Sequence, residues 1–128
     1  MNQENRKYDL EDRLIEFAAL IIEVTESLLN TRAGNHLAGQ VVRSGTSPAL
    51  HYGEAQSAES RNDFIHKLKV LLKELRETLA ALKLIRRVSL SGKPETVEKA
   101  IKESNELISI FVKSVETARK NNVKTKTE

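Results

Sequence analysis

The chain has 128 residues and a mass of 14.4 kDa, the size of one domain that can bury a single core without disulfides or metal. Few aromatic residues, no Cys and a predominance of helix-forming residues exclude a disulfide-stapled module and favour an all-α fold over a β-sandwich. The net charge of +3 is divided unevenly: residues 1–30 carry three basic and seven acidic residues, net −4, and residues 61–88 carry eight basic and three acidic residues, net +5.

The sequence contains no apolar run long enough for a membrane span. The longest, Phe17 to Ile22, has about a third of the length that a transmembrane helix needs. Charged residues occupy the first positions, at Glu4, Arg6 and Lys7, where a signal peptide would begin its apolar stretch. We therefore expect a cytoplasmic protein with no membrane partner.

A first helix is predicted to begin at Asp9. Its apolar seam follows alternating spacings of four and three residues: Leu10, Leu14, Phe17, Ile21, Val24 and Leu28. A second apolar stripe lies beside this seam: Ile15, Ala18, Ile22 and Leu29. Two stripes make a wider apolar face than one neighbouring helix covers, so we expect this helix to contact more than one partner.

The second segment is rich in small residues. A loop is predicted at Asn30–Asn35, and a helix should begin at Leu37. Gly and Ala residues along this helix predict close contacts with its neighbours. Pro48 removes one backbone donor, so a kink or short break is expected near Gly45–Ser47.

Two further helices follow. Ser60 or Asn62 should cap the third helix, whose seam ends where Ser89–Pro94 interrupts it. Pro94 suits the first turn of a fourth helix, which should continue to about residue 118. Four helices joined by short loops predict an antiparallel up-down-up-down four-helix bundle over residues 9–118, with flexible ends at residues 1–8 and 119–128.

The middle of the chain carries several sequence elements of one known family. They occur in order between Gln40 and Ile85: QVVRSGTS at 40–47, EA at 54–55, DFI at 63–65 and KELRET at 73–78. In these elements the chain resembles the small bacterial proteins of the 23S rRNA intervening-sequence family, which includes accessory proteins of diversity-generating retroelements. Two positions depart from that pattern: His51 stands where Asn is common, and Ala81-Leu82 where an aromatic residue precedes Leu.

The resemblance implies more than composition can show. It implies a four-helix bundle that assembles into a ring-like homo-oligomer, usually a pentamer, without enzymatic activity or cofactor. For the retroelement accessory members, it also implies binding of nucleic acid and of a reverse transcriptase. Functions tied to the two departing positions do not transfer to this chain.

A row of cations is predicted along one face of the third helix. Its members fall at offsets of 0, 4, 7, 14 and 18 residues: Lys69, Lys73, Arg76, Lys83 and Arg87. The row spans about 27 Å of helix axis, so it could follow a phosphate backbone of RNA or DNA. It could equally be a solvated face, in which Glu77 pairs with Lys73 four residues before it.

Polar residues of the second helix suggest ion pairs rather than catalysis. If the turn between the second and third helices centres near residues 59–60, Arg43 should lie near Glu74 or Glu77, and Glu54 near His66 or Lys67. We interpret these pairs as buried or interface ion pairs that fix helix register.

His51, Glu54 and His66 could in principle form a metal-binding triad. The expected inward positions of the first and fourth helices are apolar, however, and a metal site in a helix bundle needs more carboxylates. No nucleophile motif or phosphate-binding loop is present. We therefore assign no catalytic residue and no metal ligand.

Two functions remain open. The first is a homo-oligomeric accessory protein that binds nucleic acid through the basic row. The alternative is an assembly or protein-protein interaction scaffold with no nucleic-acid role.

Overall fold

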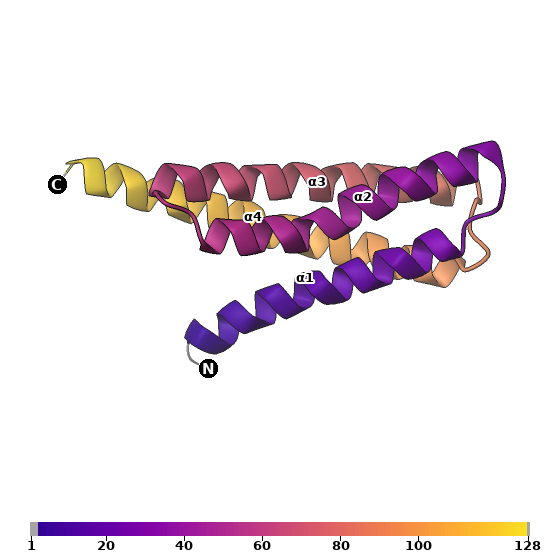
Figure 1. Ribbon diagram of the computed structural model, residues 1–128, viewed down its shortest axis with the longest axis horizontal. Helices are drawn as coiled ribbons and strands as arrows, with labels where there is room; N and C mark the ends of the chain where they lie inside the picture. Colours follow the sequence, from indigo (N-terminus) through magenta and orange to yellow (C-terminus); the bar gives the residue numbers. More distant parts are fainter. Residues whose placement is uncertain (1–2, 128) are drawn as a thin grey trace.

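The structure, a computed structural model, describes the backbone of residues 3–127 and the side chains of residues 10–121. It contains four α-helices, α1 (Gln3–Glu26), α2 (Arg32–Gln56), α3 (Arg61–Arg87) and α4 (Pro94–Thr127). Successive helices run antiparallel and pack side by side, and α4 also touches α1 (Figure 1). The predicted all-α, up-down-up-down four-helix bundle is confirmed.

The contact between α1 and α4 is the least extensive of the contacts between neighbouring helices. α1 packs closely against α2 and much less closely against α4. Figure 1 shows the N-terminal half of α1 diverging from the other three helices. A groove lies between α1 and α4, lined on α1 by residues 16–23.

Two predicted helix starts are too late in the chain. α1 begins at Gln3 rather than Asp9, and α2 begins at Arg32 rather than Leu37. α2 begins earlier because Thr31, which the prediction placed in a loop, is its N-cap. The Thr31 hydroxyl accepts a hydrogen bond of 3.1 Å from the Gly34 N–H. Residues 32–35 of the predicted loop therefore form the first turn of the helix, and residues 30–31 remain outside it.

Of the kink or short break expected near Gly45–Ser47, the break does not form, since α2 is helical throughout and contains Pro48 within it. A proline inside a helix removes a single backbone bond, and the helix can continue past it with a bend. The hydroxyls of Thr46 and Ser47 bond back to the carbonyls of Val42 and Arg43 at 2.6 Å, an interaction that accompanies helix bending. Figure 1 shows α2 changing direction near its middle.

The starts of α3 and α4 lie where the sequence predicts them. Ser60 caps α3 by accepting a hydrogen bond of 3.0 Å from the Asp63 N–H, and Pro94 is the first residue of α4. α4 continues to Thr127, past the predicted end near residue 118. Flexibility of residues 1–8 and 119–128 stays a prediction, and residues 1–2 and 128 lie outside the described part of the chain.

The core is built from the apolar seams of all four helices. Its largest fully buried side chains are Phe17, Phe111, Leu14, Ile21, Leu68, Leu71, Leu75, Leu82, Ile85 and Leu107. At Gly45 the helices approach so closely that an added Cβ would lie 2.6 Å from a carbon of Ile21. The predicted close contact of the small-residue helix is therefore found between α2 and α1.

The two connections at one end of the bundle are fastened to each other. The Leu29 N–H donates to the Leu90 carbonyl at 2.9 Å, and the Gly92 N–H donates to the Ser27 carbonyl at 2.9 Å. The hydroxyls of Ser27 and Ser91 are also 2.6 Å apart. These bonds tie the α1–α2 connection to the α3–α4 connection, and so hold the C-terminal end of α3 in place relative to α1.

Candidate nucleic-acid interface

The basic row of α3 lies on the surface of the bundle. All five members are exposed: Lys69, Lys73, Arg76, Lys83 and Arg87. The opposite face of α3 carries the buried Leu residues of the core, which fix the rotation of the helix and turn the row outward. The row that the spacing predicts thus lies on one exposed helix face, interrupted at Ala80.

The five cations of the row form no ion pair and no side-chain hydrogen bond with any described residue. Other cations of the bundle do form ion pairs, including Arg13, Arg43, Lys67 and Arg86. Helix spacing made Glu77 a possible partner of Lys73. In the structure Glu77 instead accepts a hydrogen bond from Arg43 of α2. The row therefore keeps its positive charge exposed to solvent.

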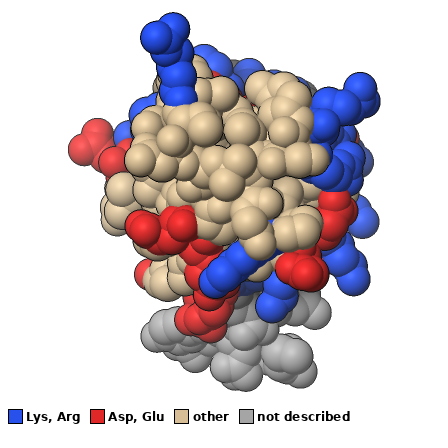
Figure 2. Space-filling view, turned by 90° about the vertical axis from the view of Figure 1, so that its right-hand side faces the viewer, with Lys and Arg blue, Asp and Glu red and all other residues tan. Residues whose placement is uncertain are grey.

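Figure 2 looks along the bundle onto the end that holds the α1–α2 and α3–α4 connections. The centre of this end is uncharged, and Lys and Arg side chains are most abundant along its right-hand edge. Positive charge is thus denser on the right-hand side of this end, although acidic side chains lie among the cations there (Figure 2). Such an asymmetric field attracts polyanions to that side.

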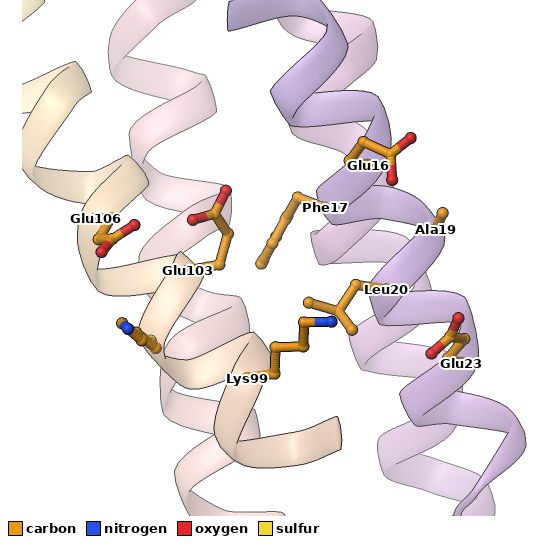
Figure 3. A pocket seen from close by; sticks show the side chains of 9 residues that line it. Glu16, Phe17, Ala19, Leu20, Glu23, Lys99, Glu103 and Glu106 are labelled. Atoms are coloured by element: carbon orange, nitrogen blue, oxygen red, sulfur yellow. The ribbon is translucent and has the colours of Figure 1, made fainter. Parts of the chain in front are cut away.

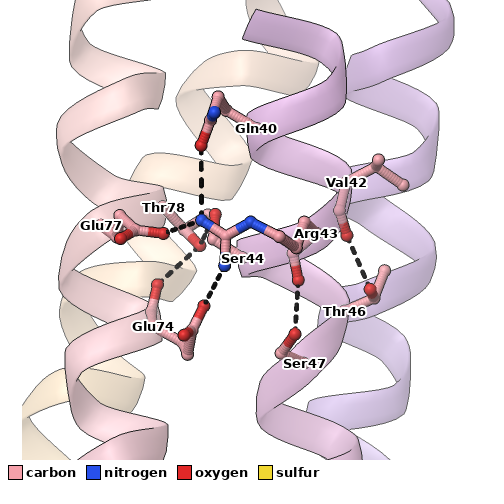
Figure 4. A network of polar contacts seen from close by, with 9 residues as sticks. All are labelled: Gln40, Val42, Arg43, Ser44, Thr46, Ser47, Glu74, Glu77 and Thr78. Atoms are coloured by element: carbon pink, nitrogen blue, oxygen red, sulfur yellow. Dashed lines mark hydrogen bonds and ion pairs between the residues drawn. The ribbon is translucent and has the colours of Figure 1, made fainter.

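Arg43 is the centre of a polar network between α2 and α3 (Figure 4). Its Nη1 atom lies 3.3 Å from Glu74 Oε2, and its Nη2 atom donates to Glu77 and, at 3.3 Å, to Gln40 Oε1. The hydrogen bond and charge of Glu77 raise the pKa of the Arg43 guanidinium. These are the carboxylates that the register count placed opposite Arg43. Of the two alternatives, a buried or an interface pair, the buried one does not form, because the Arg43 side chain is 51% exposed at the α2–α3 contact.

Glu54 lies between α2 and α3 near the connection that joins them. Its Oε2 atom is 3.6 Å from Lys67 Nζ and 3.6 Å from His51 Nδ1. His66 is exposed. In the described part of the chain, no three His, Asp or Glu side chains come together as metal ligands do, so the triad of His51, Glu54 and His66 does not form.

Sequence reasoning missed the ion-pair cluster that bridges α1 and α4. Arg13 Nε and Nη2 donate to the two carboxylate oxygens of Glu103 at 2.7 and 2.8 Å, and Nη2 also reaches Glu106 at 2.6 Å. The Arg13 hydrogen bonds lower the pKa of Glu103, and Glu103 in turn raises the pKa of Arg13. These partners are 90 residues apart and carry no local spacing signal, so only the packed bundle reveals the cluster.

The groove between α1 and α4 lies next to this cluster and has a volume of about 430 Å³. Phe17 and Leu20 of α1 point into it, and Lys99 reaches across from α4 (Figure 3). Its lining carries four carboxylates, Glu16, Glu23, Glu103 and Glu106, and two lysines, Lys99 and Lys102. Because carboxylates outnumber lysines there, the groove is less suited to a phosphate backbone than the basic row.

Comparison with known proteins agrees with this architecture. The family described as 23S rRNA-intervening sequence protein matches residues 6–113. The chain belongs to this family. The match reaches into α1 and α4, beyond the Gln40–Ile85 region that carries the sequence elements.

A solved structure shares the fold. It is a protein of unknown function from the S23 ribosomal protein family of Bacteroides thetaiotaomicron VPI-5482, with a TM-score of 0.74 and 33% sequence identity. The alignment covers 82% of this chain and 96% of that protein. No curated protein matches the chain. Among the described residues of this family member, none of the helices combines the length and apolar character that crossing a bilayer requires.

Proposed function

We propose that this protein is a non-catalytic homo-oligomer that binds the phosphate backbone of nucleic acid through the basic row of α3. The observation that carries the proposal is the exposure of five cations on one helix face, with no ion pair to any described residue. Paired cations such as Arg43 contribute little net field. Unpaired cations in a row bind a polyanion and release its condensed counterions.

The chemistry of the row favours backbone contact over base recognition. No aromatic side chain interleaves its five members, so stacking of unpaired bases has no platform there. Cations alone contact phosphates in any sequence and in either RNA or DNA. We therefore expect affinity that depends steeply on salt and weakly on nucleotide sequence.

Oligomerisation is supported by the apolar surface that the single chain leaves exposed. Among the described residues, seven large apolar side chains are exposed: Ile15, Ile22, Leu29, Val42, Leu50, Leu84 and Val88. Leu50 is the most exposed, at 70%. Association of copies would cover this surface, and the family resemblance favours five copies in a ring. A ring would repeat the basic row around its axis and strengthen its field.

The alternative is an assembly scaffold with no nucleic-acid role. The same exposed apolar side chains support it, since they require only a protein partner. For members that accompany retroelements the resemblance adds a reverse transcriptase as partner, which either function could accommodate. Binding to nucleic acid is the property that separates the two.

The test compares two double charge reversals. Lys69→Glu with Lys73→Glu changes the basic row, and Lys113→Glu with Lys120→Glu makes the same charge change at exposed positions of α4. Affinity for labelled duplex and single-stranded RNA and DNA is measured over a salt series, with the mass of each variant measured by light scattering.

We expect the α3 variant alone to bind every nucleic acid more weakly, with its salt slope reduced by about 0.9 for each phosphate that the row no longer neutralises. If the α3 variant keeps both the wild-type mass and the wild-type affinity, the nucleic-acid hypothesis is wrong. The assembly scaffold is then the remaining function.

A further inference from the structure

Most of the exposed apolar surface lies on one side of the bundle, on two neighbouring helices. Five of the seven exposed large apolar side chains among the described residues form what we call the α1–α2 face: Ile15, Ile22, Leu29, Val42 and Leu50. Ile15, Ile22 and Leu29 recur every seven residues. Ile15 and Ile22 therefore lie along one line of α1, and Leu29 follows in the α1–α2 connection.

The packing of α1 shows to which side this line faces. Ile22 lies nine residues after Arg13, which places the two side chains on opposite sides of α1. Arg13, on the other flank of α1, reaches α4. The line of apolar side chains is thus on the α2 side of α1. On α2, Val42 lies one turn before Gly45, the residue that packs against Ile21 of α1.

Two glycines of α2 have no explanation within the single chain. A Cβ added at Gly39 or Gly53 would have nothing within 4 Å, whereas at Gly45 it would collide with Ile21. Glycine inside a helix lowers its stability, so its use at open positions needs another reason. Close approach of a second chain to this part of α2 supplies one, and it agrees with the exposed apolar side chains beside these glycines.

The charge around the α1–α2 face decides which surface of a second copy can cover it. The exposed charged residues of α1 nearest its apolar line are acidic, at Glu11, Asp12 and Glu26. Two such faces pressed together would bring these carboxylates against each other. On α2, Arg43 is already paired with Glu74 and Glu77, which leaves Arg32 as the exposed cation nearest Leu29. A surface that is basic as well as apolar therefore complements this face better than a second copy of the same face does.

The same chain offers such a surface at the C-terminal end of α3. Leu84 and Val88 are the other two exposed large apolar side chains of the described residues, and Lys83 and Arg87 stand beside them. This end of α3 and the α1–α2 face are distinct surfaces of the bundle, so contact between them is head-to-tail. A head-to-tail contact repeated between copies can close into a ring.

We infer that the α1–α2 face of one copy receives the C-terminal end of α3 of the next copy, with Leu84 and Val88 against its apolar side chains. Lys83 and Arg87 then meet the acidic residues of α1. This inference rests on the oligomer of the proposed function. It also divides the basic row into two cations at the contact and three outside it. Lys69, Lys73 and Arg76, farther from the contact, stay open to phosphate.

Two complementary variants test the contact. Ile22→Asp with Leu50→Asp disables the α1–α2 face, and Leu84→Glu with Val88→Glu disables the end of α3. All four side chains are exposed, so neither variant disturbs the core. Ser109→Asp, at an exposed position of α4, is the control. Masses are measured by analytical ultracentrifugation over a concentration series.

Each double variant alone should sediment as a monomer of 14.4 kDa, while the Ser109→Asp control keeps the wild-type mass. Mixing the two variants should produce a complex of two chains, because one intact surface of each kind remains. Formation of that complex also shows that both variants are folded. The milder Ile22→Ser with Leu50→Ser replaces the first variant if circular dichroism shows a reduced helix content.

Three results would overturn the inference: wild-type mass for either double variant, monomers only in the mixture of folded variants, or self-association of the α3 variant through its intact α1–α2 face. If the wild-type protein is itself a monomer, the homo-oligomer of the proposed function is wrong. Nucleic-acid binding by the Lys69 and Lys73 variant is measured separately, so its failure is distinguishable from both.

Discussion

The hydroxyl groups of Ser44 on α2 and Thr78 on α3 lie 2.8 Å apart in the centre of the bundle, where both residues are buried. The Thr78 hydroxyl also donates to the Glu74 carbonyl at 2.8 Å, so the Ser44 hydroxyl supplies the hydrogen between the two side chains. No buried side-chain nitrogen or oxygen of the described residues lacks a partner. This hydrogen bond joins α2 and α3 at the level of the Arg43 network.

Breaking this hydrogen bond from the α3 side should be costly. Thr78→Val keeps the shape of the side chain but leaves the Ser44 hydroxyl buried without its partner, and we expect a loss of about 1–3 kcal/mol in the free energy of unfolding. The double variant Ser44→Ala with Thr78→Val should lose less than the sum of the single changes, because no orphaned hydroxyl remains. Urea denaturation measures all three variants, and strictly additive losses would contradict the coupling.

Gly45 should not tolerate a larger residue. The Cβ of Gly45→Ala would lie 2.6 Å from Ile21 Cγ2, so the helices must separate, and we expect a loss of roughly 1–3 kcal/mol in the free energy of unfolding. Gly39→Ala, with open space around its Cβ, should instead stabilise α2 by about 1 kcal/mol. Both changes are best compared by thermal unfolding in the Ile22→Asp with Leu50→Asp background, where association does not contribute. Equal effects at the two glycines would refute this packing argument.

The Arg13–Glu103 pair should make stability depend on pH in the acid range. Because Arg13 lowers the pKa of Glu103, the pair stabilises the fold above the ordinary carboxyl pKa, and this stabilisation disappears as pH falls through the lowered value. Glu103→Gln should therefore cost up to about 1 kcal/mol at pH 7, since Arg13 is partly exposed, and little in strong acid.

Glu116→Gln is the matched control for this pH effect, because Glu116 is exposed on the same helix and forms no ion pair with the described residues. Its unfolding free energy should follow the wild-type pH profile. A Glu103→Gln profile parallel to that of wild type from neutral to strongly acid pH would show that the pair has no part in acid stability.

Nucleic-acid binding should distinguish unpaired from paired arginines. Arg76→Gln removes a cation with no ion-pair partner among the described residues, and it should weaken binding and reduce the salt slope by about 1. Arg43→Gln removes a cation already neutralised by Glu74 and Glu77, so its effect should be much smaller. Electrophoretic mobility or fluorescence anisotropy at several salt concentrations measures both. Equal losses of affinity would show that total charge, rather than the basic row, governs binding.

Much of the bundle follows from local sequence patterns. Ser60 and Pro94 mark the starts of α3 and α4 because capping and the missing proline N–H act within one turn. Helix periodicity likewise places the basic row on one face, since positions along a helix have known angles. Even the Arg43 contacts follow from counting residues on each side of a short turn, because antiparallel helices joined by such a turn have little freedom of register.

Features that depend on how distant helices dock were not predictable in this way. The sequence offered Glu77 two partners, Arg43 by the register of the turn and Lys73 by helix spacing, and only the docked helices show that Arg43 bonds it. Arg43 itself is exposed rather than buried, because it lies on the outer edge of the α2–α3 contact.

Four amphipathic helices, their order and the row of cations on α3 can all be read from the amino-acid sequence, because each depends on spacings within a few turns. Two outcomes required the packed bundle: Arg13 holds α1 to Glu103 of α4, and the second apolar stripe of α1 remains exposed beside α2. Both depend on the angle at which α1 packs. That angle is set by close contacts such as Ile21 on Gly45, between residues that no local period connects.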